Sequence, residues 1–371
     1  MLKPTKRPAR ACFSSGPCAK PPGWSAAKLN TDALGRSHRS SLGKARLRLC
    51  IGLMRETLAL PETHRIAIVA GSDTGAFELA MWSMLGGRAV TTLAWESFGE
   101  GWVTDAVKQL KLDPTIIRAD YGKLPDLSQV DWSTDVLFTW NGTTSGVRVP
   151  GAQWIPADRE GLSFADATSA VFAYDIDWSK IDVGTFSWQK ALGGEGGHGV
   201  LILGPRAVER LESFTPDRPL PKLFRLTKAG KLIEGIFAGE TINTPSMLAV
   251  EDAIFALEWA KSIGGLDGMI ARTNANASAL DRIVQGRSWL GYLAQDPASR
   301  STTSVCLTVA GADADYIKRM VELLDAEDVA YDIASYRDAP PGLRIWCGAT
   351  VDAADIEALG PWLDYAWEQS K

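Results

Sequence analysis

Apolar and polar positions along the chain change their spacing several times, and these changes predict an alternation of helices and buried strands. Apolar side chains recur at helical spacing over residues 43–60, and Pro61 ends this predicted helix. Strands that are apolar on both faces and alternate with helices are typical of a mostly parallel sheet covered on both sides, so we expect an α/β fold. The predicted strands cover residues 65–70, 88–94, 115–117, 135–140, 161–165, 170–174, 181–187 and 199–204, and the predicted helices that alternate with them cover residues 76–85, 101–110 and 206–213.

The pattern changes after Pro205. Residues 215–243 carry no clear period and are predicted as a long irregular connection. Two long helices follow, over residues 245–262 and 266–284, and the tail then predicts a small α+β domain with the order strand, helix, strand, strand, helix. These five elements are expected at residues 304–309, 313–324, 331–334, 343–347 and 352–367. The predicted organisation is an N-terminal arm with an active-site loop (residues 1–40), a large domain (41–245) and a small C-terminal domain (246–371).

Composition narrows the class of protein. The chain has 371 residues, a formal net charge of −5 and 22% charged residues, with no long basic run, so we expect no nucleic-acid partner. Its five cysteines form no CxxC pair, which argues against a disulfide framework or a metal site. No apolar run approaches the length of a membrane span, and the basic N-terminus lacks the apolar region of a secretory signal. We therefore expect a cytoplasmic protein without a membrane anchor.

One lysine stands out. Lys190 follows the predicted strand 181–187 and precedes a glycine-rich loop, Gly193-Gly194-Glu195-Gly196-Gly197. Such a position holds an amine at the edge of a sheet, although most lysines that begin loops are simply solvated. Asp166 ends the predicted strand 161–165, where a carboxylate is costly without a partner. An aspartate and a lysine on neighbouring strand ends are what a pyridoxal 5'-phosphate enzyme needs, because the lysine forms the Schiff base and the aspartate keeps the ring nitrogen protonated.

Other strand ends carry polar or aromatic residues. Asp73 and Thr74 lie between a predicted strand and a helix, where backbone N–H groups can hold a phosphate, although any such turn looks similar. The turn Asn141-Gly142-Thr143-Thr144-Ser145-Gly146 could contact a ligand or only satisfy its own backbone. Phe98 and Trp102 could stack on a ring or belong to the core.

Four basic residues are candidates for anion binding. His38 and Arg39 share one loop, which suits an anionic group. Arg337 and Arg344 flank Pro340-Pro341-Gly342, and Arg344 begins a predicted strand from which it could hold a carboxylate with two hydrogen bonds. Either arginine could equally lie on the surface.

Together, several stretches resemble the phosphoserine aminotransferases, which are class V, fold-type I pyridoxal phosphate transaminases. The likeness covers nearly the whole chain, and the ordered set is specific although no single member is. It rests on Phe13-Ser14-Ser15-Gly16-Pro17, Ser37-His38-Arg39, Asn141-Gly142-Thr143-Thr144-Ser145-Gly146-Val147, Asp166-Ala167-Thr168-Ser169, Trp188-Gln189-Lys190-Ala191-Leu192-Gly193 and Ile242-Asn243-Thr244-Pro245.

The resemblance implies a fold, an assembly and a set of site residues. The fold would be a mostly parallel seven-stranded sheet with helices on both faces, in a large cofactor-binding domain, plus the small C-terminal α+β domain. The assembly would be a homodimer with shared active sites. Lys190 would carry the cofactor, Asp166 would bind the ring nitrogen, and Phe98, or alternatively Trp102, would stack on the ring. The remaining cofactor contacts would be Thr143 near the ring hydroxyl, Asp73, Thr74 and Gln189 at the phosphate, and Asn243 and Thr244 from the second subunit; the substrate contacts would be Ser15, His38, Arg39, Arg337 and Arg344.

The implied reaction is the reversible transamination of 3-phosphohydroxypyruvate with L-glutamate, giving O-phospho-L-serine and 2-oxoglutarate in serine biosynthesis. A role on 4-phosphohydroxy-L-threonine in pyridoxine biosynthesis stays open. So do another class V activity (serine–pyruvate or alanine–glyoxylate aminotransferase) and a non-catalytic protein that keeps the fold. The chain departs from the family pattern at Asn141-Gly142-Thr143, where many members have Asn-Glu-Thr, and at Gly71-Ser72-Asp73-Thr74-Gly75, which lacks an arginine. The loop between Arg337 and Arg344 also differs in length from that of some members.

Overall fold

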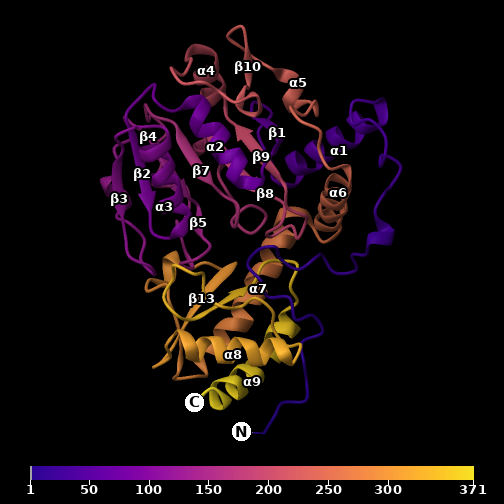
Figure 1. Cartoon of the computed structure of the whole chain (residues 1–371), viewed down its shortest axis with the longest axis vertical. Coiled ribbons are helices and arrows are strands. Elements are labelled where there is room, and N and C mark those ends of the chain that lie inside the picture. Colours follow the sequence, from indigo (N-terminus) through magenta and orange to yellow (C-terminus); the bar gives the residue numbers. More distant parts are fainter. Residues whose placement is uncertain (1) are drawn as a thin grey trace.

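The computed structural model describes residues 2–371, and the larger part of the molecule is built on a seven-stranded sheet (Figure 1). The strand order is β1-β9-β8-β7-β4-β2-β3, and the ladders between β8, β7, β4, β2 and β3 are parallel, whereas β9 is antiparallel to both of its neighbours. The expected mostly parallel α/β sheet is therefore confirmed. The strands are β1 (Arg65–Ala70), β2 (Val90–Ala94), β3 (Thr115–Arg118), β4 (Asp135–Thr139), β7 (Ser163–Asp166), β8 (Val183–Ser187) and β9 (His198–Leu203).

Most strands of this sheet are buried on both faces, which explains their apolar runs, whereas the edge strand β3 is only partly buried. Along β1, Ile66 and Ile68 belong to one hydrophobic cluster, while Ala67 and Val69 belong to a second cluster on the opposite face. Helix α2 packs against β8 and β9, and α1 packs against β1 and α6. The helices of this part are α1 (Ser41–Thr57), α2 (Ser72–Met84), α3 (Ser97–Thr104), α4 (Pro205–Ser213), α5 (Glu234–Phe237) and α6 (Met247–Ser262).

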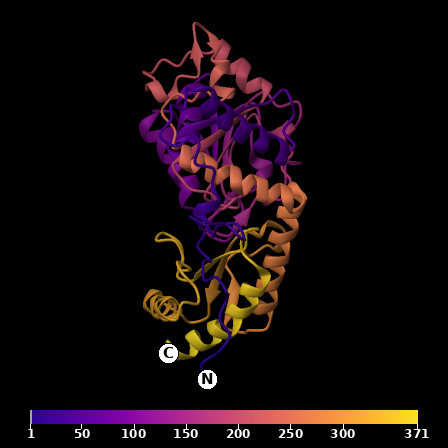
Figure 2. The ribbon, with the colours of Figure 1, turned by 90° about the vertical axis from the view of Figure 1, so that its right-hand side faces the viewer.

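The smaller part of the molecule is a three-stranded antiparallel sheet with three long helices (Figures 1 and 2). The N-terminal segment lies against it, since the backbone N–H of Trp346 donates to the carbonyl of Phe13 at 3.0 Å, and the indole of Trp362 donates to the carbonyl of Lys6 at 2.8 Å. Its elements are α7 (Gly265–Gln285), β12 (Leu290–Tyr292), β13 (Ser304–Val309), α8 (Ala314–Ala326), β14 (Leu343–Trp346) and α9 (Ala353–Gln369). The division of the chain into domains stays a prediction.

Four features of the structure differ from the predictions. Residues 170–174 are turns rather than a strand, because the N–H groups of Val171 and Tyr174 donate to the nearby carbonyls of Ala167 and Ala170. A short buried apolar run has no period by which to separate a strand from another buried segment. Residues 331–334 make only two isolated bridges, from Tyr331 to Cys12 and from Ala334 to Leu343. Strand β12 was missed, and the connection over residues 215–243 contains α5 and a short hairpin.

The remaining elements are short. The hairpin consists of β10 (Thr227–Lys228) and β11 (Lys231–Leu232), and a second small ladder joins β5 (Asn141–Gly142) to β6 (Val147–Arg148). A π-helical turn continues α3 over Asp105–Gln109. Within residues 2–371, none of the helices combines the length and the apolar character that crossing a membrane requires. The short 3-10 helices are Ala26–Lys28, Leu127–Gln129, Trp178–Lys180, Lys222–Phe224 and Pro297–Ser299.

Candidate active site

A cavity lies at the carboxyl ends of β4, β7 and β8, the edge at which ligands bind in open α/β sheets. It brings together eight residues that were expected to contact the cofactor. They come from the ends of β7 and β8, the first turn of α2, the α3 segment and the turn after β4. These residues are Asp73, Thr74, Phe98, Trp102, Thr143, Asp166, Gln189 and Lys190, and the rest of the lining is Ser72, Thr139, Asn141 and Thr168.

Lys190 lies three residues beyond the end of β8 and points into this cavity. Its Nζ donates a hydrogen bond to the backbone carbonyl of Ser15, so the N-terminal segment forms one wall beside it. Burial lowers the pKa of the Lys190 amine from its ordinary value, and the positive charge of Arg344 lowers it further, against the opposing effects of Cys18, Asp166 and Asp73. A lower pKa raises the neutral fraction of an amine, which is the nucleophilic and basic form.

The glycine-rich loop after Lys190 is held by Asp252 of α6, whose side chain is only 2% exposed. Its Oδ2 accepts from the backbone N–H of Glu195 at 2.8 Å and from Nζ of Lys20 at 2.9 Å, and its Oδ1 accepts from Nε1 of Trp24 at 2.8 Å. Lys20 also lies 2.6 Å from the Glu195 carboxylate. Sequence reasoning missed this residue, and the available signal was an acid among the apolar positions of a long helix.

Asp166 ends β7 and lines the cavity. Its Oδ2 accepts from Nε1 of Trp102 at 3.1 Å, and its Oδ1 accepts from the backbone N–H of Thr168 at 3.1 Å. The Trp102 ring also packs against Phe77, with ring centroids 4.5 Å apart. Phe98 is 39% exposed and faces Tyr336 at 5.7 Å, so it lies at the mouth of the cavity whereas Trp102 lies in its wall.

Asp73 is buried in the first turn of α2, close to Asp166. Burial raises the pKa of its carboxyl well above the usual range, and the negative charge of Asp166 adds to this effect. A neutral Asp73 does not repel an anionic group placed at the N-terminus of α2, where backbone N–H groups point outward.

Unpaired polar atoms around the cavity test whether a polar cofactor fits. Several buried side-chain atoms have no hydrogen-bond partner among residues 2–371, and an unsatisfied buried polar atom is costly unless a ligand pairs with it. These residues therefore fit pyridoxal phosphate, which carries a ring nitrogen, a ring hydroxyl and a phosphate. The unpaired atoms are Asp73 Oδ1, Thr139 Oγ1, Asn141 Oδ1, Thr168 Oγ1, Thr185 Oγ1 and Gln189 Oε1.

Glu96 is a second residue that sequence reasoning missed. It is 2% exposed, and it accepts from the backbone N–H of Gly99 at 2.8 Å and from the hydroxyl of Thr144 at 2.7 Å. It therefore caps α3 and ties that helix to the turn containing Thr143. Burial raises the pKa of Glu96 to about 7. A charged residue two positions after β2 was the signal that could have identified it.

The expected substrate residues divide into two groups. Ser15 and Arg344 lie beside the cavity: the Ser15 carbonyl contacts Lys190, and the charge of Arg344 acts on the Lys190 amine. The Nε of Arg344 is buried without a partner in the described chain. Arg337 is exposed on the loop before β14, with its guanidinium 5.3 Å from the Tyr336 ring and its Nε 3.6 Å from the Asp338 carboxylate.

The second substrate group, His38 and Arg39, does not line the cavity within this chain, and neither do the expected cofactor residues Asn243 and Thr244. Arg39 lines a separate hollow together with Thr241 and Ile242. His38 precedes Arg39 in the same loop, and burial lowers its pKa. Asn243 and Thr244 come directly after Ile242 in the chain, and the Asn243 amide donates to the carbonyl of Thr244 at 3.1 Å. Residues 38–39 and residues 243–244 therefore lie near one another, and neither pair lies near Lys190 of the same chain.

Comparison with known proteins gives a consistent result. No protein-family model matches the chain. A phosphoserine aminotransferase from Methanosarcina barkeri is 57% identical over 371 residues, which is 100% of both chains. The solved structure of a phosphoserine aminotransferase from Cytophaga hutchinsonii superposes with a TM-score of 0.83 at 20% identity, covering 95% of this chain and 98% of that one.

The fold by itself is shared more widely. An alanine–glyoxylate aminotransferase from Nostoc sp. has a TM-score of 0.81 at 16% identity, covering 99% of this chain and 97% of that one. The fold alone therefore does not distinguish these aminotransferase families. The family assignment rests on the full-length sequence identity, which exceeds one half. The family expected from the motifs is confirmed, and the chain belongs to the phosphoserine aminotransferase family.

Proposed function

We propose that the cavity binds pyridoxal 5'-phosphate at Lys190 and that the protein interconverts 3-phosphohydroxypyruvate and O-phospho-L-serine, with L-glutamate and 2-oxoglutarate as the second pair. Membership of this family makes the protein a pyridoxal phosphate-dependent aminotransferase of serine biosynthesis. The observation that carries the residue assignment is the meeting of Lys190 and Asp166 in one cavity, from the ends of the neighbouring parallel strands β8 and β7.

The cofactor, when bound, supplies a ring that withdraws electrons from the bonds at the substrate α-carbon. Asp166 holds a proton at the ring nitrogen, since its carboxylate lies in the cavity wall and is oriented by Trp102 and Thr168. Lys190, with its lowered pKa, would move the proton between the substrate α-carbon and the cofactor carbon, in one direction in the first half-reaction and in the opposite direction in the second. The loop held by Asp252 positions the lysine for both steps.

Other residues bind and orient the cofactor. Phe98 is our choice for stacking on the ring, because the Trp102 ring is packed on Phe77 and its N–H is engaged with Asp166. The first turn of α2 (Asp73 and Thr74) would hold the phosphate through backbone N–H groups, and the amide NH2 group of Gln189, which also lines the cavity, would donate to it. The Thr143 hydroxyl would lie near the ring hydroxyl.

We propose that substrates are held by cations from two copies of the chain. Arg344 would bind the carboxylate common to all the substrates, with Arg337 and Ser15 nearby. His38 and Arg39 would bind the substrate phosphate, and Asn243 and Thr244 the cofactor phosphate, from the second subunit of a homodimer. Their position together on a surface away from Lys190 of the same chain supports this arrangement.

The test is a comparison of amino acceptors on the purified, cofactor-loaded protein. We expect L-glutamate to change the visible absorption of the enzyme, and 3-phosphohydroxypyruvate to restore it and to sustain turnover. A kcat/KM for glyoxylate or pyruvate equal to or above that for 3-phosphohydroxypyruvate would overturn the proposed substrate. Absence of any spectral change with glutamate would overturn transamination itself. Activity on 4-phosphohydroxy-L-threonine and a cytoplasmic location stay predictions.

A further inference from the structure

Glu96 is a buried acid that the proposed reaction does not use. Its side chain is 2% exposed, and within residues 2–371 it forms no salt bridge with a lysine, arginine or histidine. It does not line the cavity around Lys190. A buried carboxylate without a cationic partner is unfavourable unless hydrogen bonds satisfy it, so its donors show what it holds in place.

The donors to Glu96 come from two different segments. Its Oε1 accepts from the backbone N–H of Gly99 at 2.8 Å, in the first turn of α3. Its Oε2 accepts from the hydroxyl of Thr144 at 2.7 Å and from the backbone N–H of Thr144 at 3.3 Å, in the turn between β5 and β6. Gly99 directly follows Phe98, which lines the cavity, and Thr144 directly follows another lining residue, Thr143. One carboxylate thus joins the segments that carry two expected cofactor contacts.

Glycine at position 142 leaves the room that this arrangement needs. A Cβ atom at Gly142 would lie 2.8 Å from Cγ of Glu96 and 2.7 Å from Nε1 of Trp95. The Trp95 indole is itself fixed, because it donates to the carbonyl of Val147 at 3.0 Å. The turn between β5 and β6 therefore has a shape that admits the Glu96 side chain.

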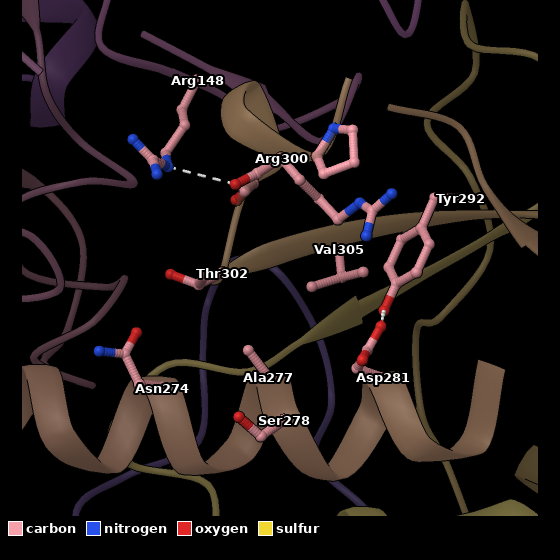
Figure 3. A pocket seen from close by; sticks show the side chains of 11 residues that line it. Arg148, Asn274, Ala277, Ser278, Asp281, Tyr292, Arg300, Thr302 and Val305 are labelled. Carbon is pink, nitrogen blue, oxygen red and sulfur yellow. Dashed lines mark hydrogen bonds between the residues drawn. The ribbon is translucent and has the colours of Figure 1, made fainter. Parts of the chain in front are cut away.

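Other contacts of this turn come from the smaller part of the molecule. In one of them, Nε of Arg148 in β6 donates to the carbonyl of Arg300 at 3.2 Å (Figure 3). In another, the hydroxyl of Ser304 donates to the carbonyl of Thr143 at 2.6 Å. Neither contact involves α3, so they fix the turn without fixing the helix that carries the expected ring-stacking residue.

The Thr144 hydroxyl is a point at which helix and turn meet. It donates to Glu96, and it accepts from the backbone N–H of Ser97 at 3.3 Å. Thr144 is 1% exposed and does not line the cavity. A change to its hydroxyl therefore tests the link between helix and turn without altering a group that faces the cofactor.

We propose that Glu96 is a positioning residue of the active site, which holds Phe98 and Thr143 at a fixed spacing on either side of the cofactor ring. This inference rests on the proposed cofactor site, because the two residues contact the ring only under that proposal. Glu96 acts through them and touches neither cofactor nor substrate. Without it, α3 and the turn would have to be ordered each time the cofactor binds, which weakens binding.

The experiment measures the dissociation constant of pyridoxal 5'-phosphate for the full chain after removal of the cofactor, from the quenching of tryptophan fluorescence. The pH is set well above the pKa of about 7 that burial gives Glu96, so that the wild type carries a carboxylate. Glu96→Ala is expected to raise this dissociation constant by about tenfold, the effect of losing hydrogen bonds to a charged group. Glu96→Gln keeps one acceptor oxygen and is expected to raise it less.

Asp313→Ala is the matched control. Asp313 caps α8 as Glu96 caps α3, and it accepts from the backbone N–H of Tyr316 at 2.8 Å, but it is exposed in the smaller part of the molecule. Because both variants lose a helix cap, urea denaturation is expected to show a lower stability in each. Only Glu96→Ala is expected to weaken cofactor binding.

Variants of Thr144 decide the question even if Glu96→Ala does not fold. Thr144→Val keeps the shape without the hydroxyl and is expected to weaken cofactor binding by about fivefold, whereas Thr144→Ser keeps the hydroxyl and is expected to stay within about twofold of the wild type. Unchanged binding in Glu96→Ala or Thr144→Val, or equal weakening in Asp313→Ala, would overturn this inference alone. A wild-type protein that does not bind the cofactor would overturn the proposed function, and the inference with it.

Discussion

Lys190 combines partial burial, a lowered pKa and a glycine-rich continuation, and these three properties suit an amine that must leave and return to one atom. We expect Lys190→Ala to reduce turnover by about 10²–10⁴-fold or more, because the proton at the substrate α-carbon loses its base. Steady-state assays measure this loss, and borohydride treatment is expected to couple the cofactor covalently to the wild type but not to the variant. Lys318→Ala is the control and keeps both properties. Wild-type turnover by Lys190→Ala would refute the role.

Glu96 gives the protein a pH-dependent stability. Its pKa is raised to about 7 by burial, above that of an unfolded glutamate, so the folded state binds more protons between those two values. The free energy of unfolding therefore falls as pH rises through this window and is constant above it. In Glu96→Gln this fall is expected to be smaller by on the order of 1–3 kcal/mol. Urea denaturation of both proteins at several pH values measures the difference, and parallel pH profiles would contradict it.

The loop that follows β8 is controlled by an element distant in sequence, helix α6. Asp252→Ala removes the acceptor for Lys20, Trp24 and the Glu195 backbone, which is expected to destabilise the fold by about 1–3 kcal/mol. Hydrogen exchange is expected to accelerate in residues 191–197 more than elsewhere. Glu258→Ala, which changes an exposed acid on the same helix, is the control. Unchanged exchange in this loop would show that Asp252 does not position it.

Secondary-structure elements could be predicted where the spacing of apolar residues and the positions of helix- and strand-ending residues indicate the same element. Strands β1 and β13 have the bounds expected from their apolar runs, and the long helices were expected with shifts at their ends, whereas α5 lies in a stretch predicted as irregular and α3 begins before the predicted helix and gives way to a π-helical turn. The strand predicted over residues 170–174 is wrong because these residues are apolar through burial in turns and not through strand pairing. Strand β12 was missed because three residues carry too little pattern to be recognised.

The whole molecule is expected to work as a dimer with composite sites. Lys190→Ala and Arg39→Gln would each inactivate a site, but from different subunits under this proposal. Co-expression of the two variants is expected to restore about a quarter of wild-type activity, since half of the dimers would contain one intact site. Differently tagged chains allow the mixed dimer to be isolated and assayed. Activity no higher than the sum of the separate variants would argue that Arg39 acts within its own chain or not at all.

The sequence by itself determined the family, the α/β class and the pairing of Lys190 with Asp166, because these depend on local runs and on residue types at strand ends. Which side chains surround the lysine was a tertiary outcome. Asp252 and Glu96 acquire their roles only through burial against segments far away in the chain. Local spacing carries no information about such contacts, since the two residues of each pair lie 57 and 48 positions apart in the chain and are brought together by packing.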